Sequence, residues 1–247
     1  MRFLGRRGTG ASGEPPAIAP LEEFHGFHYL RHNQRRLEHL ATLGLPLGGR
    51  SVIEVGAGIG DHTEFFLDRG CSVLTSDGRP ENVAVLRERY PWIAVRLLDL
   101  DQPDPSFADA AEIVYCYGTL YHLGRPEEAL AFLAARCQSL LLLETCVSFG
   151  DDLSLNAVDE LSFHPSQAVS GRGCRPTRPW VLDQLRRHFE HVYVPHTQPW
   201  HPEFPLDWTA APPPAGELSR AVFVASREVL VNPALSETLL ERQTRHE

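Results

Sequence analysis

The feature that most constrains this chain is a short apolar segment that ends in three alternating glycines. Residues 51–61 are Ser-Val-Ile-Glu-Val-Gly-Ala-Gly-Ile-Gly-Asp. The β-branched residues Val52, Ile53 and Val55 are typical of a buried strand, and the glycines allow the backbone to turn sharply beside a ligand because no Cβ intervenes. A helical segment follows from about Asp61, and its first amide groups would face that ligand. A strand, a glycine turn and a helix in this order predict a cofactor pocket in an open α/β sheet.

Segments of strand and helix character alternate after this stretch. Strands are expected over 51–55, 71–76, 93–98, 112–117, 139–144, 191–195 and 220–226, and helices over 61–69, 80–90, 126–137 and 179–188. This alternation predicts an α/β fold with a doubly wound, mainly parallel sheet.

A single domain is expected over residues 21–226, and it includes a helical cap and two loops. Residues 1–20 are rich in Gly, Pro, Ala and Arg and are interpreted as a mobile tail. Residues 21–48 carry apolar side chains at helical spacing and are interpreted as an N-terminal helical cap, which either covers the pocket or packs on the sheet edge. Two polar stretches are expected to form substrate-side loops, 145–177 as an insertion after strand five and 196–214. Residues 227–247 are interpreted as a partly helical C-terminal tail on the surface.

The composition limits the classes of partner. The 32 acidic residues against 23 basic ones give a net charge of −9, which argues against a broad surface for nucleic acid or anionic membrane. The five cysteines show no C-x-x-C spacing, and Cys71, Cys116 and Cys137, which lie in apolar surroundings, are expected to be small buried apolar residues. No signal-peptide pattern or bilayer-length apolar run is present, so a soluble cytoplasmic protein is expected. The oligomeric state is left open.

The glycine spacing discriminates between cofactors. A dinucleotide fingerprint requires G-x-G-x-x-G, whereas here Asp61 occupies the position of the third glycine of that motif. A carboxylate there would repel a pyrophosphate, so NAD is disfavoured. No Gly-Lys-Ser/Thr follows, which excludes a P-loop.

The pattern E-x-G-x-G-x-G after a strand resembles motif I of the class I S-adenosylmethionine-dependent methyltransferases. That family has a Rossmann-like sheet of seven strands with the last one antiparallel, and the resemblance implies S-adenosyl-L-methionine as the cofactor. An acidic residue after the second strand binds the ribose hydroxyls in that family, and one after the third strand holds the adenine amino group; Asp77 and Asp99 match these positions. A carboxylate suits a ribose diol and tolerates a cationic ligand. The expected cofactor-binding residues are Glu54, Gly56, Gly58, Gly60, Asp77, Asp99, Leu100 and Tyr117.

Two later segments strengthen and narrow the resemblance. Residues 118–123 resemble the L-Y-H-L segment that many of these enzymes place beside the transferred methyl group. Together with residues 142–147 and Gly150-Asp151, they are also similar to the tRNA wobble-uridine carboxymethyltransferase family, whose members use a carboxylated relative of the cofactor and act on tRNA.

The catalytic candidate is His122, because the carboxyl ends of strands four and five face the pocket and a histidine suits proton removal from an acceptor. The alternative is a histidine that bonds the backbone at a helix start. Glu144, which ends strand five, could orient His122, bind a substrate hydroxyl or be a structural carboxylate. The aromatic residues of 196–208 are interpreted as a lid over the acceptor, or alternatively as a loop covering the sheet edge. The expected substrate-binding residues are Tyr121, Glu144, Arg175, Trp200 and His201.

A metal site is considered for His196, His201 and Glu203. These residues lie in a loop without H-x-H or H-x-x-x-H spacing, so no metal site is predicted.

These observations predict a methyltransferase that acts at oxygen on a small-molecule or sugar/glycan acceptor, with His122 as the general base. Nucleic acid and membrane are not expected as partners. The alternatives are a tRNA-modifying (carboxy)methyltransferase and a cofactor-binding scaffold without catalysis.

Overall fold

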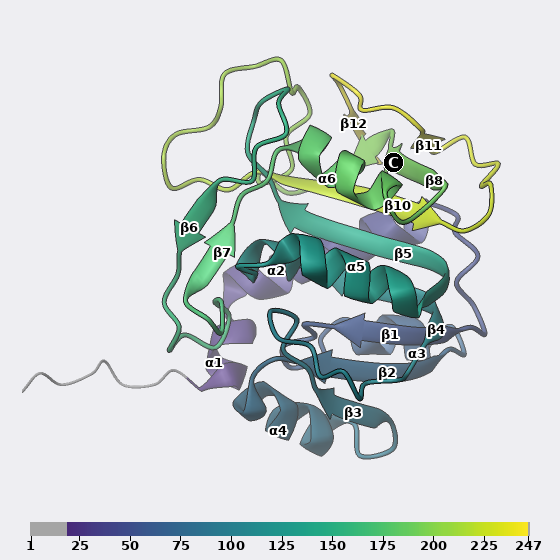
Figure 1. Ribbon diagram of the computed structural model, residues 1–247, viewed down its shortest axis with the longest axis vertical. Helices are drawn as coiled ribbons and strands as arrows, with labels where there is room; N and C mark the ends of the chain where they lie inside the picture. Colours follow the sequence, from purple (N-terminus) through teal and green to yellow (C-terminus); the bar gives the residue numbers. More distant parts are fainter. Residues whose placement is uncertain (1–18, 247) are drawn as a thin grey trace, which may run out of the picture.

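The computed structural model describes residues 19–246. Its centre is an eight-stranded sheet with the strand order β11-β8-β10-β5-β4-β1-β2-β3 (Figure 1). The strands of this sheet are β1 (Ser51–Val55), β2 (Ser72–Asp77), β3 (Ala94–Leu97), β4 (Ala111–Tyr117), β5 (Cys137–Cys146), β8 (His191–Pro195), β10 (Arg220–Ser226) and β11 (Leu235–Ser236).

The helices are α1 (Pro20–Phe24), α2 (Phe27–Thr42), α3 (Thr63–Leu67), α4 (Pro80–Arg89), α5 (Pro126–Arg136) and α6 (Arg178–Arg186), with a 3-10 turn η1 (Leu120–His122) after β4. Two small sheets lie apart from the main one. They pair β6 (Ala157–Asp159) with β7 (Arg172–Cys174), and β9 (Thr197–Gln198) with β12 (Thr244–Arg245).

The strand directions confirm the predicted doubly wound, Rossmann-like sheet. β3, β2, β1, β4 and β5 run parallel to their neighbours. β10 enters antiparallel between β5 and β8, as expected for the seventh strand. The two-residue strand β11 then adds an eighth member, antiparallel to β8, which was not predicted.

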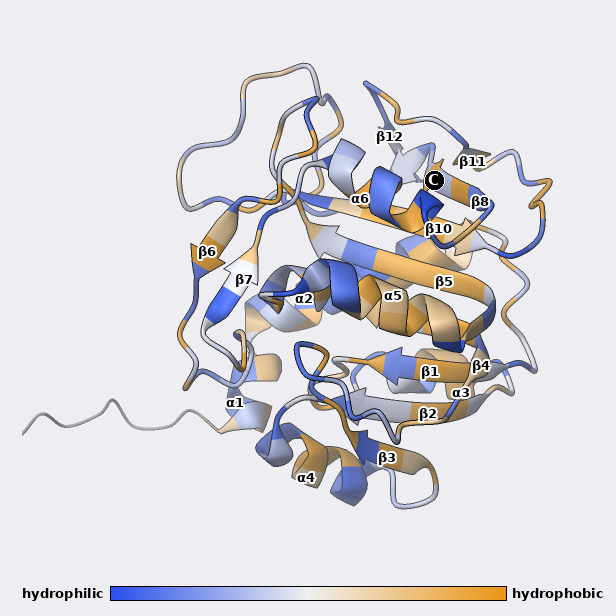
Figure 2. Ribbon diagram, viewed as in Figure 1, coloured by the Kyte–Doolittle hydropathy of each residue, from blue (hydrophilic) through white to orange (hydrophobic). Residues whose placement is uncertain are grey.

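Alternation along the strands divides the core into two faces. On one face Ile53 packs in a cluster with side chains of α5 and α6, and on the other Val52 packs with side chains of α2 and α3. Helix α4 covers the β3 end in a smaller cluster that contains Leu86. The central strand β5 is almost entirely buried and is coloured mainly as apolar (Figure 2). The layered arrangement leaves the carboxyl ends of the parallel strands free to form a site.

Several predicted segments differ in the structure. The helix expected over 61–69 is shorter, since α3 covers only Thr63–Leu67. The prediction of a partly helical C-terminal tail is wrong. Residues 227–246 contain no helix, and they pair with the rest of the protein through β11 and β12. The mobile-tail prediction falls mostly on residues 1–18, which lie outside the described residues, while α1 begins at Pro20.

Two other expectations can be compared directly with the structure. All five cysteines are free and buried, which confirms the prediction made for Cys71, Cys116 and Cys137. Among the described residues, no helix has the length and apolar character needed to cross a bilayer.

Candidate active site

A large cavity opens at the carboxyl ends of β1, β2 and β4. Its floor consists of the glycine turn and the residues that follow β2, β3 and β4. Phe24 of α1 and Tyr29, His32 and Arg36 of α2 form one wall, and residues 165–169 of the insertion form another. The N-terminal helices and the insertion after β5 therefore both enclose the site.

The glycine turn adopts backbone conformations that other residues rarely reach. Gly56, Gly58 and Gly60 have φ values of 60°, 58° and 83°. A Cβ on Gly58 would lie 2.9 Å from the ring of Phe24, and one on Gly60 would lie 2.7 Å from the ring of Tyr90. The cavity lining includes Gly56 and Gly58 but not Gly60. Gly58 thus lets α1 approach the turn, whereas Gly60 is required for packing against α4.

Asp77 lies at the end of β2, where its carboxylate is buried and faces the turn. Its Oδ2 accepts a hydrogen bond from the Gly58 amide at 2.8 Å, and its Oδ1 accepts from the Arg79 amide at 2.9 Å and from Asn82 Nδ2 at 3.1 Å. Burial raises the pKa of Asp77 to about 6, against the lowering effect of these hydrogen bonds. A carboxylate offers about four acceptor positions, so Asp77 retains room for a ligand hydroxyl.

Glu54 is another buried carboxylate of the cavity and is the next-to-last residue of β1. Its Oε2 accepts a hydrogen bond of 2.5 Å from Thr63 Oγ1. Burial raises the pKa of Glu54 to about 7. A cationic group bound beside it would favour its charged form.

The other acidic residues near the turn have separate partners. Asp61, which stands where a dinucleotide-binding motif has its third glycine, pairs with Arg89 at 2.7 Å. This ion pair neutralises its carboxylate. Asp99 follows β3, lines the cavity and accepts a hydrogen bond from the Asp101 amide at 2.9 Å. Leu100 also lines the cavity and is buried. The structure therefore brings together the predicted cofactor-binding residues, with Gly60 in a supporting role.

His122 lies at the end of η1, lines the cavity and is hydrogen-bonded through Nδ1 to Glu160. Burial lowers the pKa of His122, and the bond to Glu160 offsets this only in part. Burial would raise the pKa of Glu160, but the bond to His122, the Ala168 amide and the charge of Arg175 lower it overall. Glu160 is thus an ionised acceptor that fixes Nδ1 as the protonated nitrogen of a neutral His122.

Glu160 was not found by sequence reasoning, which considered Glu144 as the residue that orients His122. That interpretation is wrong, because the fully buried Glu144 carboxylate pairs with two arginines instead. Arg36 Nη2 lies 2.7 Å from Oε2 and Arg220 Nη1 lies 3.2 Å from Oε1. Glu144 does not line the cavity, so its expected contact with substrate is also corrected. It connects α2 to β10 beneath the site.

Tyr117 and Tyr121, both predicted as site residues, are among the four tyrosines that line the cavity, together with Tyr29 and Tyr115. Tyr117, at the end of β4, is buried and stacks on Tyr115 with ring centroids 4.4 Å apart. Its hydroxyl has no hydrogen-bond partner among the described residues. The hydroxyl of Tyr121 accepts a hydrogen bond of 3.2 Å from Arg220 Nη2. Tyr117 and Tyr121 thus line the cavity, where the sequence predicted them, and the Tyr117 hydroxyl is available to a ligand.

The remaining predicted substrate residues lie outside the cavity lining. Arg175 contacts Glu160 Oε1 at 3.3 Å and supports the carboxylate that holds His122. Trp200 is exposed, and its Nε1 donates to the His246 carbonyl at 2.7 Å. His201 is buried, with its ring centroid 4.8 Å from that of His32. The structure therefore does not place these three side chains in the cavity.

The aromatic-lid interpretation of residues 196–208 is also corrected. The ring of Phe204 is fully buried in the core cluster beside α2 and α3. Trp208 packs against the opposite cluster and donates to Gln243 Oε1 at 2.8 Å. These two rings pack against the hydrophobic core. The cavity is instead lined by residues 165–169 of the insertion.

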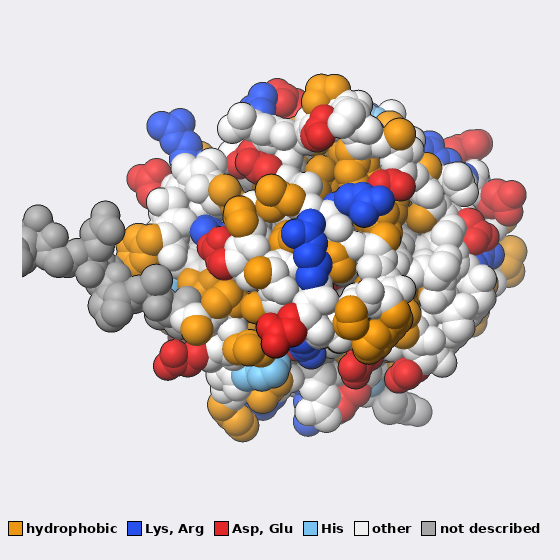
Figure 3. Space-filling view, turned by 90° about the horizontal axis from the view of Figure 1, so that it is seen from below, with side chains coloured by type: hydrophobic (Ala, Val, Ile, Leu, Met, Phe, Trp, Pro, Cys, Tyr) orange, Lys and Arg blue, Asp and Glu red, His pale blue; other side chains and the backbone are white. Residues whose placement is uncertain are grey.

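Figure 3 views the molecule from the side of α4 and β3. On this face basic and acidic side chains are interspersed among apolar and uncharged ones, and they form no continuous basic surface.

The comparisons with known proteins agree with this site. Residues 53–137, from β1 through α5, match the family model described as "Methyltransferase domain". The sequence of residues 53–137 is that of a methyltransferase domain. This confirms the resemblance drawn from the motifs that follow β1, β2, β3 and β4.

Solved structures share the fold of this methyltransferase domain. The N-terminal domain of EvdMO1, crystallised with SAH and D-fucose, is 20% identical and superposes with a TM-score of 0.60 over 78% of this chain and 82% of that one. The 1,6-didemethyltoxoflavin-N1-methyltransferase of Burkholderia thailandensis is 19% identical, with a TM-score of 0.51 over 87% and 92% of the two chains.

A curated relative matches part of the methyltransferase sequence. The tRNA U34 carboxymethyltransferase of Hahella chejuensis is 34% identical over 114 residues, which are 43% of this chain and 35% of the relative. The matched region thus spans about a third of the length of that relative.

Proposed function

We propose that this protein transfers a methyl group from S-adenosyl-L-methionine to an oxygen atom of a small-molecule or sugar acceptor. The observation that carries the proposal is one cavity that contains the glycine turn, the buried carboxylates Glu54 and Asp77, and a neutral His122 held by Glu160. The glycine turn and the two carboxylates fit an adenosyl cofactor. His122 and Glu160 fit the removal of a proton from an acceptor.

The cavity residues match the chemistry of the cofactor. Asp77 would accept from a ribose hydroxyl, and Glu54 would face the positively charged amino group. The buried Tyr117 hydroxyl, which lacks a partner among the described residues, would gain one from the ligand. When bound, the cofactor supplies a methyl group activated by a positively charged sulfur. Asp99 and Leu100 would then contact the adenine.

His122 would act as the general base on the acceptor. Because its Nδ1 donates to Glu160, its Nε2 carries the free lone pair. Its lowered pKa keeps it neutral near pH 7, so it is ready to take a proton from a hydroxyl. Loss of catalysis is expected as the pH falls through that pKa, below the ordinary value of 6.5.

The identity of the acceptor is supported by one structural neighbour. The domain of EvdMO1 that shares this fold was crystallised with D-fucose, a polar ring with several hydroxyl groups. Tyr121 and Arg220 line the present cavity near His122 and offer donors to such a ring. Sugars are therefore the first acceptors to test.

The test uses His122→Ala and Glu160→Gln in the full-length chain. Transfer of a labelled methyl group would be measured against a panel of monosaccharides and glycosylated small molecules. Loss of the base should lower turnover by about 100-fold or more, because general-base catalysis contributes roughly 10²–10⁴-fold. The Glu160 variant should lower kcat with little effect on KM and shift the pH profile. S-adenosylhomocysteine affinity, measured by calorimetry, should remain within about twofold of the parent.

Two results would refute parts of this proposal. Undiminished turnover in His122→Ala would refute the role of His122 as the base. Absence of S-adenosylhomocysteine binding by the folded parent would refute the assignment of the cofactor.

A second candidate is methyl or carboxymethyl transfer to tRNA, favoured by the match to the Hahella chejuensis enzyme. The net charge of −9 weighs against an RNA surface. Mass spectrometry of nucleosides from tRNA incubated with the protein and each cofactor form would identify this activity by a new modified uridine.

A further inference from the structure

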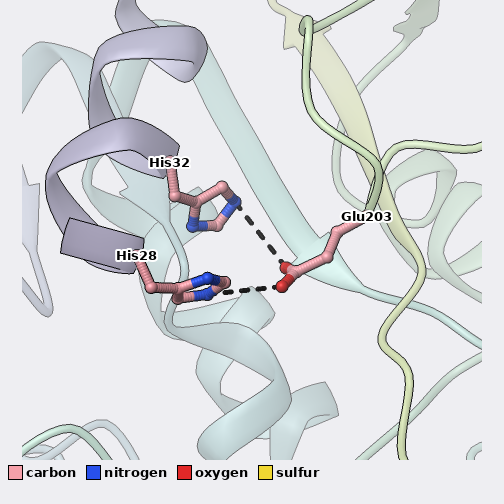
Figure 4. A group of neighbouring side chains, drawn as sticks. All are labelled: His28, His32 and Glu203. Atoms are coloured by element: carbon pink, nitrogen blue, oxygen red, sulfur yellow. Dashed lines mark ion pairs between the residues drawn. The ribbon is translucent and has the colours of Figure 1, made fainter.

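Three side chains with metal-binding atoms converge beside the cavity. His28 and His32 lie one helical turn apart on α2, on the same face because they are separated by four residues. Glu203, from the segment between β9 and β10, points toward both imidazoles (Figure 4). His28 Nε2 lies 3.4 Å from Glu203 Oε1, and His32 Nε2 lies 3.9 Å from Glu203 Oε2.

These separations suit a shared ion. The ligand atoms of the three residues lie within 4.8 Å of one another. Zinc-to-ligand bonds of roughly 2.0–2.2 Å place neighbouring ligand atoms about 3–3.5 Å apart, so small side-chain movements would bring all three atoms into coordination.

His32 provides an independent indication of a missing partner. Only 1% of this residue is exposed, and its Nε2 has no hydrogen-bond partner among the described residues. His32 therefore directs a buried nitrogen without a hydrogen-bond partner toward Glu203, and an imidazole nitrogen is a common metal ligand.

The surroundings hold Glu203 in place and balance its charge. Arg220 Nε donates to Glu203 Oε2 at 2.6 Å, which leaves Oε1 on the side of His28. Arg220 and Arg36 both pair with the buried Glu144, so two arginines and two glutamates compensate one another. Hydrogen bonds of this kind orient the carboxylate ligands of metal sites.

We propose that His28, His32 and Glu203 form a binding site for a divalent transition-metal ion. Two imidazoles and one carboxylate favour ions such as Zn²⁺, Co²⁺, Mn²⁺ or Fe²⁺ over Mg²⁺ and Ca²⁺, which prefer oxygen ligands. The His28 side chain is 60% exposed and provides a path from solvent, whereas His32 also lines the cavity. The ion would thus lie at the edge of the cavity, between solvent and the cavity wall that contains His32.

The three ligands of this site differ, except for Glu203, from the residues considered for a metal from the sequence. His196, His201 and Glu203 were considered there within one loop, while the H-x-x-x-H spacing occurs at residues 28–32, in the segment interpreted as a helical cap. Only the fold brings Glu203 to that helix.

The experiment measures binding of Co²⁺ and Zn²⁺ to the tag-free, full-length protein after treatment with a chelator. Calorimetry gives affinity and stoichiometry, and the visible spectrum of bound Co²⁺ reports nitrogen and oxygen coordination. Three variants are compared with the parent: His28→Ala, Glu203→Gln and the control His196→Ala, which removes an exposed histidine outside the cluster.

We expect one ion per parent chain and an unchanged affinity in His196→Ala. His28→Ala and Glu203→Gln should each weaken binding by a factor of about 10 or more, since even residues behind the ligands change metal affinity by roughly 10–100-fold. His28 is exposed, so its variant should fold even if the glutamate variant does not. Absence of a stoichiometric ion in the parent, or equal affinity in parent and His28→Ala, would overturn the proposal.

Discussion

Asp77 has an environment in which most of its hydrogen-bonding capacity is already used by the protein. Three bonds from Gly58, Arg79 and Asn82 fix its orientation. The bond to the Gly58 amide links the end of β2 directly to the glycine turn. A ligand hydroxyl would therefore meet a carboxylate that does not have to reorganise.

Asp77→Asn should weaken the binding of S-adenosylhomocysteine by about 10- to 100-fold, because hydrogen bonds to a charged group contribute roughly 1.5–3 kcal/mol. The asparagine keeps the shape of the side chain but replaces one acceptor oxygen by a donor. Calorimetry on the folded variant measures this effect, with circular dichroism to establish folding. Asn82→Ala is the matched control, since it removes one support of Asp77 and should cause a smaller loss. Equal affinities in Asp77→Asn and the parent would contradict the assigned role.

Glu54 makes stability depend on pH. Its pKa rises from 4.5 to about 7 on folding because the carboxyl is buried. The stabilising effect of the neutral acid is complete below the unfolded value and is lost as the pH rises through the folded one. Above pH 7 the folded protein therefore contains a buried charge that the unfolded chain would expose to water.

Glu54→Gln should accordingly stabilise the ligand-free protein at pH 8 by about 3 kcal/mol relative to the parent, the equivalent of the shift in pKa. The difference should shrink as the pH falls from 7 toward 4.5. Urea unfolding at several pH values measures it, and the same variant should bind S-adenosylhomocysteine less tightly. A difference that is constant over this pH range would show that ionisation of Glu54 does not cause it.

The predictable residues of the site are those fixed by local pattern. Glu54, Asp77, Asp99 and His122 each lie at or shortly after the end of a strand that is recognisable from its apolar run, and the carboxyl ends of parallel strands meet at one edge. Glu160 escaped prediction because it lies 38 residues beyond His122 in a polar insertion without periodicity. Glu144 was misassigned because its arginine partners come from α2 and β10.

At the scale of elements, α1 and the insertion close the cavity from opposite sides and meet at Glu23. Its Oε1 accepts a hydrogen bond from Ser166 Oγ at 3.0 Å, and its Oε2 lies 3.5 Å from His164 Nε2. Phe24, the next residue, covers Gly58. The sequence predicted helices here and left open whether they cover the pocket, since amphipathic spacing does not specify the packing partner.

Glu23→Ala should release this contact and speed dissociation of S-adenosylhomocysteine by about two- to fivefold, because partly exposed polar contacts contribute up to about 1 kcal/mol. The dissociation rate is measured by stopped-flow displacement. Glu22→Ala is the control, since Glu22 is exposed on the same helix. Equal dissociation rates in the two variants would show that Glu23 does not hold the cavity closed.

At the scale of the whole molecule, the C-terminal segment completes the body around the second half of the sheet. Sequence analysis treated residues 227–247 as a surface tail because short strands and loops have no periodic pattern. In the structure β11 extends the main sheet, and β12 pairs with β9. Gln243, which is 7% exposed, is the polar centre of this docking.

The side-chain amide of Gln243 makes three hydrogen bonds that join separate parts of the fold. Its Oε1 accepts from Gln198 Nε2 at 2.9 Å and from Trp208 Nε1 at 2.8 Å, while its Nε2 donates to the Pro195 carbonyl at 2.7 Å. Truncation of this side chain would leave these partners without a hydrogen bond in a largely buried region. Each unsatisfied buried group costs roughly 1–3 kcal/mol, although water can reach part of the space that is vacated.

Gln243→Ala should therefore lower the free energy of unfolding by about 2–4 kcal/mol in urea titrations. Val231→Ala is the control, because Val231 belongs to the same segment and is 96% exposed; it should change stability by less than about 0.5 kcal/mol. Gln243→Glu keeps the length of the side chain but removes the donor to the Pro195 carbonyl. If that bond contributes less than the bonds from Gln198 and Trp208, the free energy of unfolding of Gln243→Glu should lie between those of Gln243→Ala and Val231→Ala. If Gln243→Ala were as stable as Val231→Ala, the C-terminal segment would be a dispensable tail, and the structural account of its docking would fail.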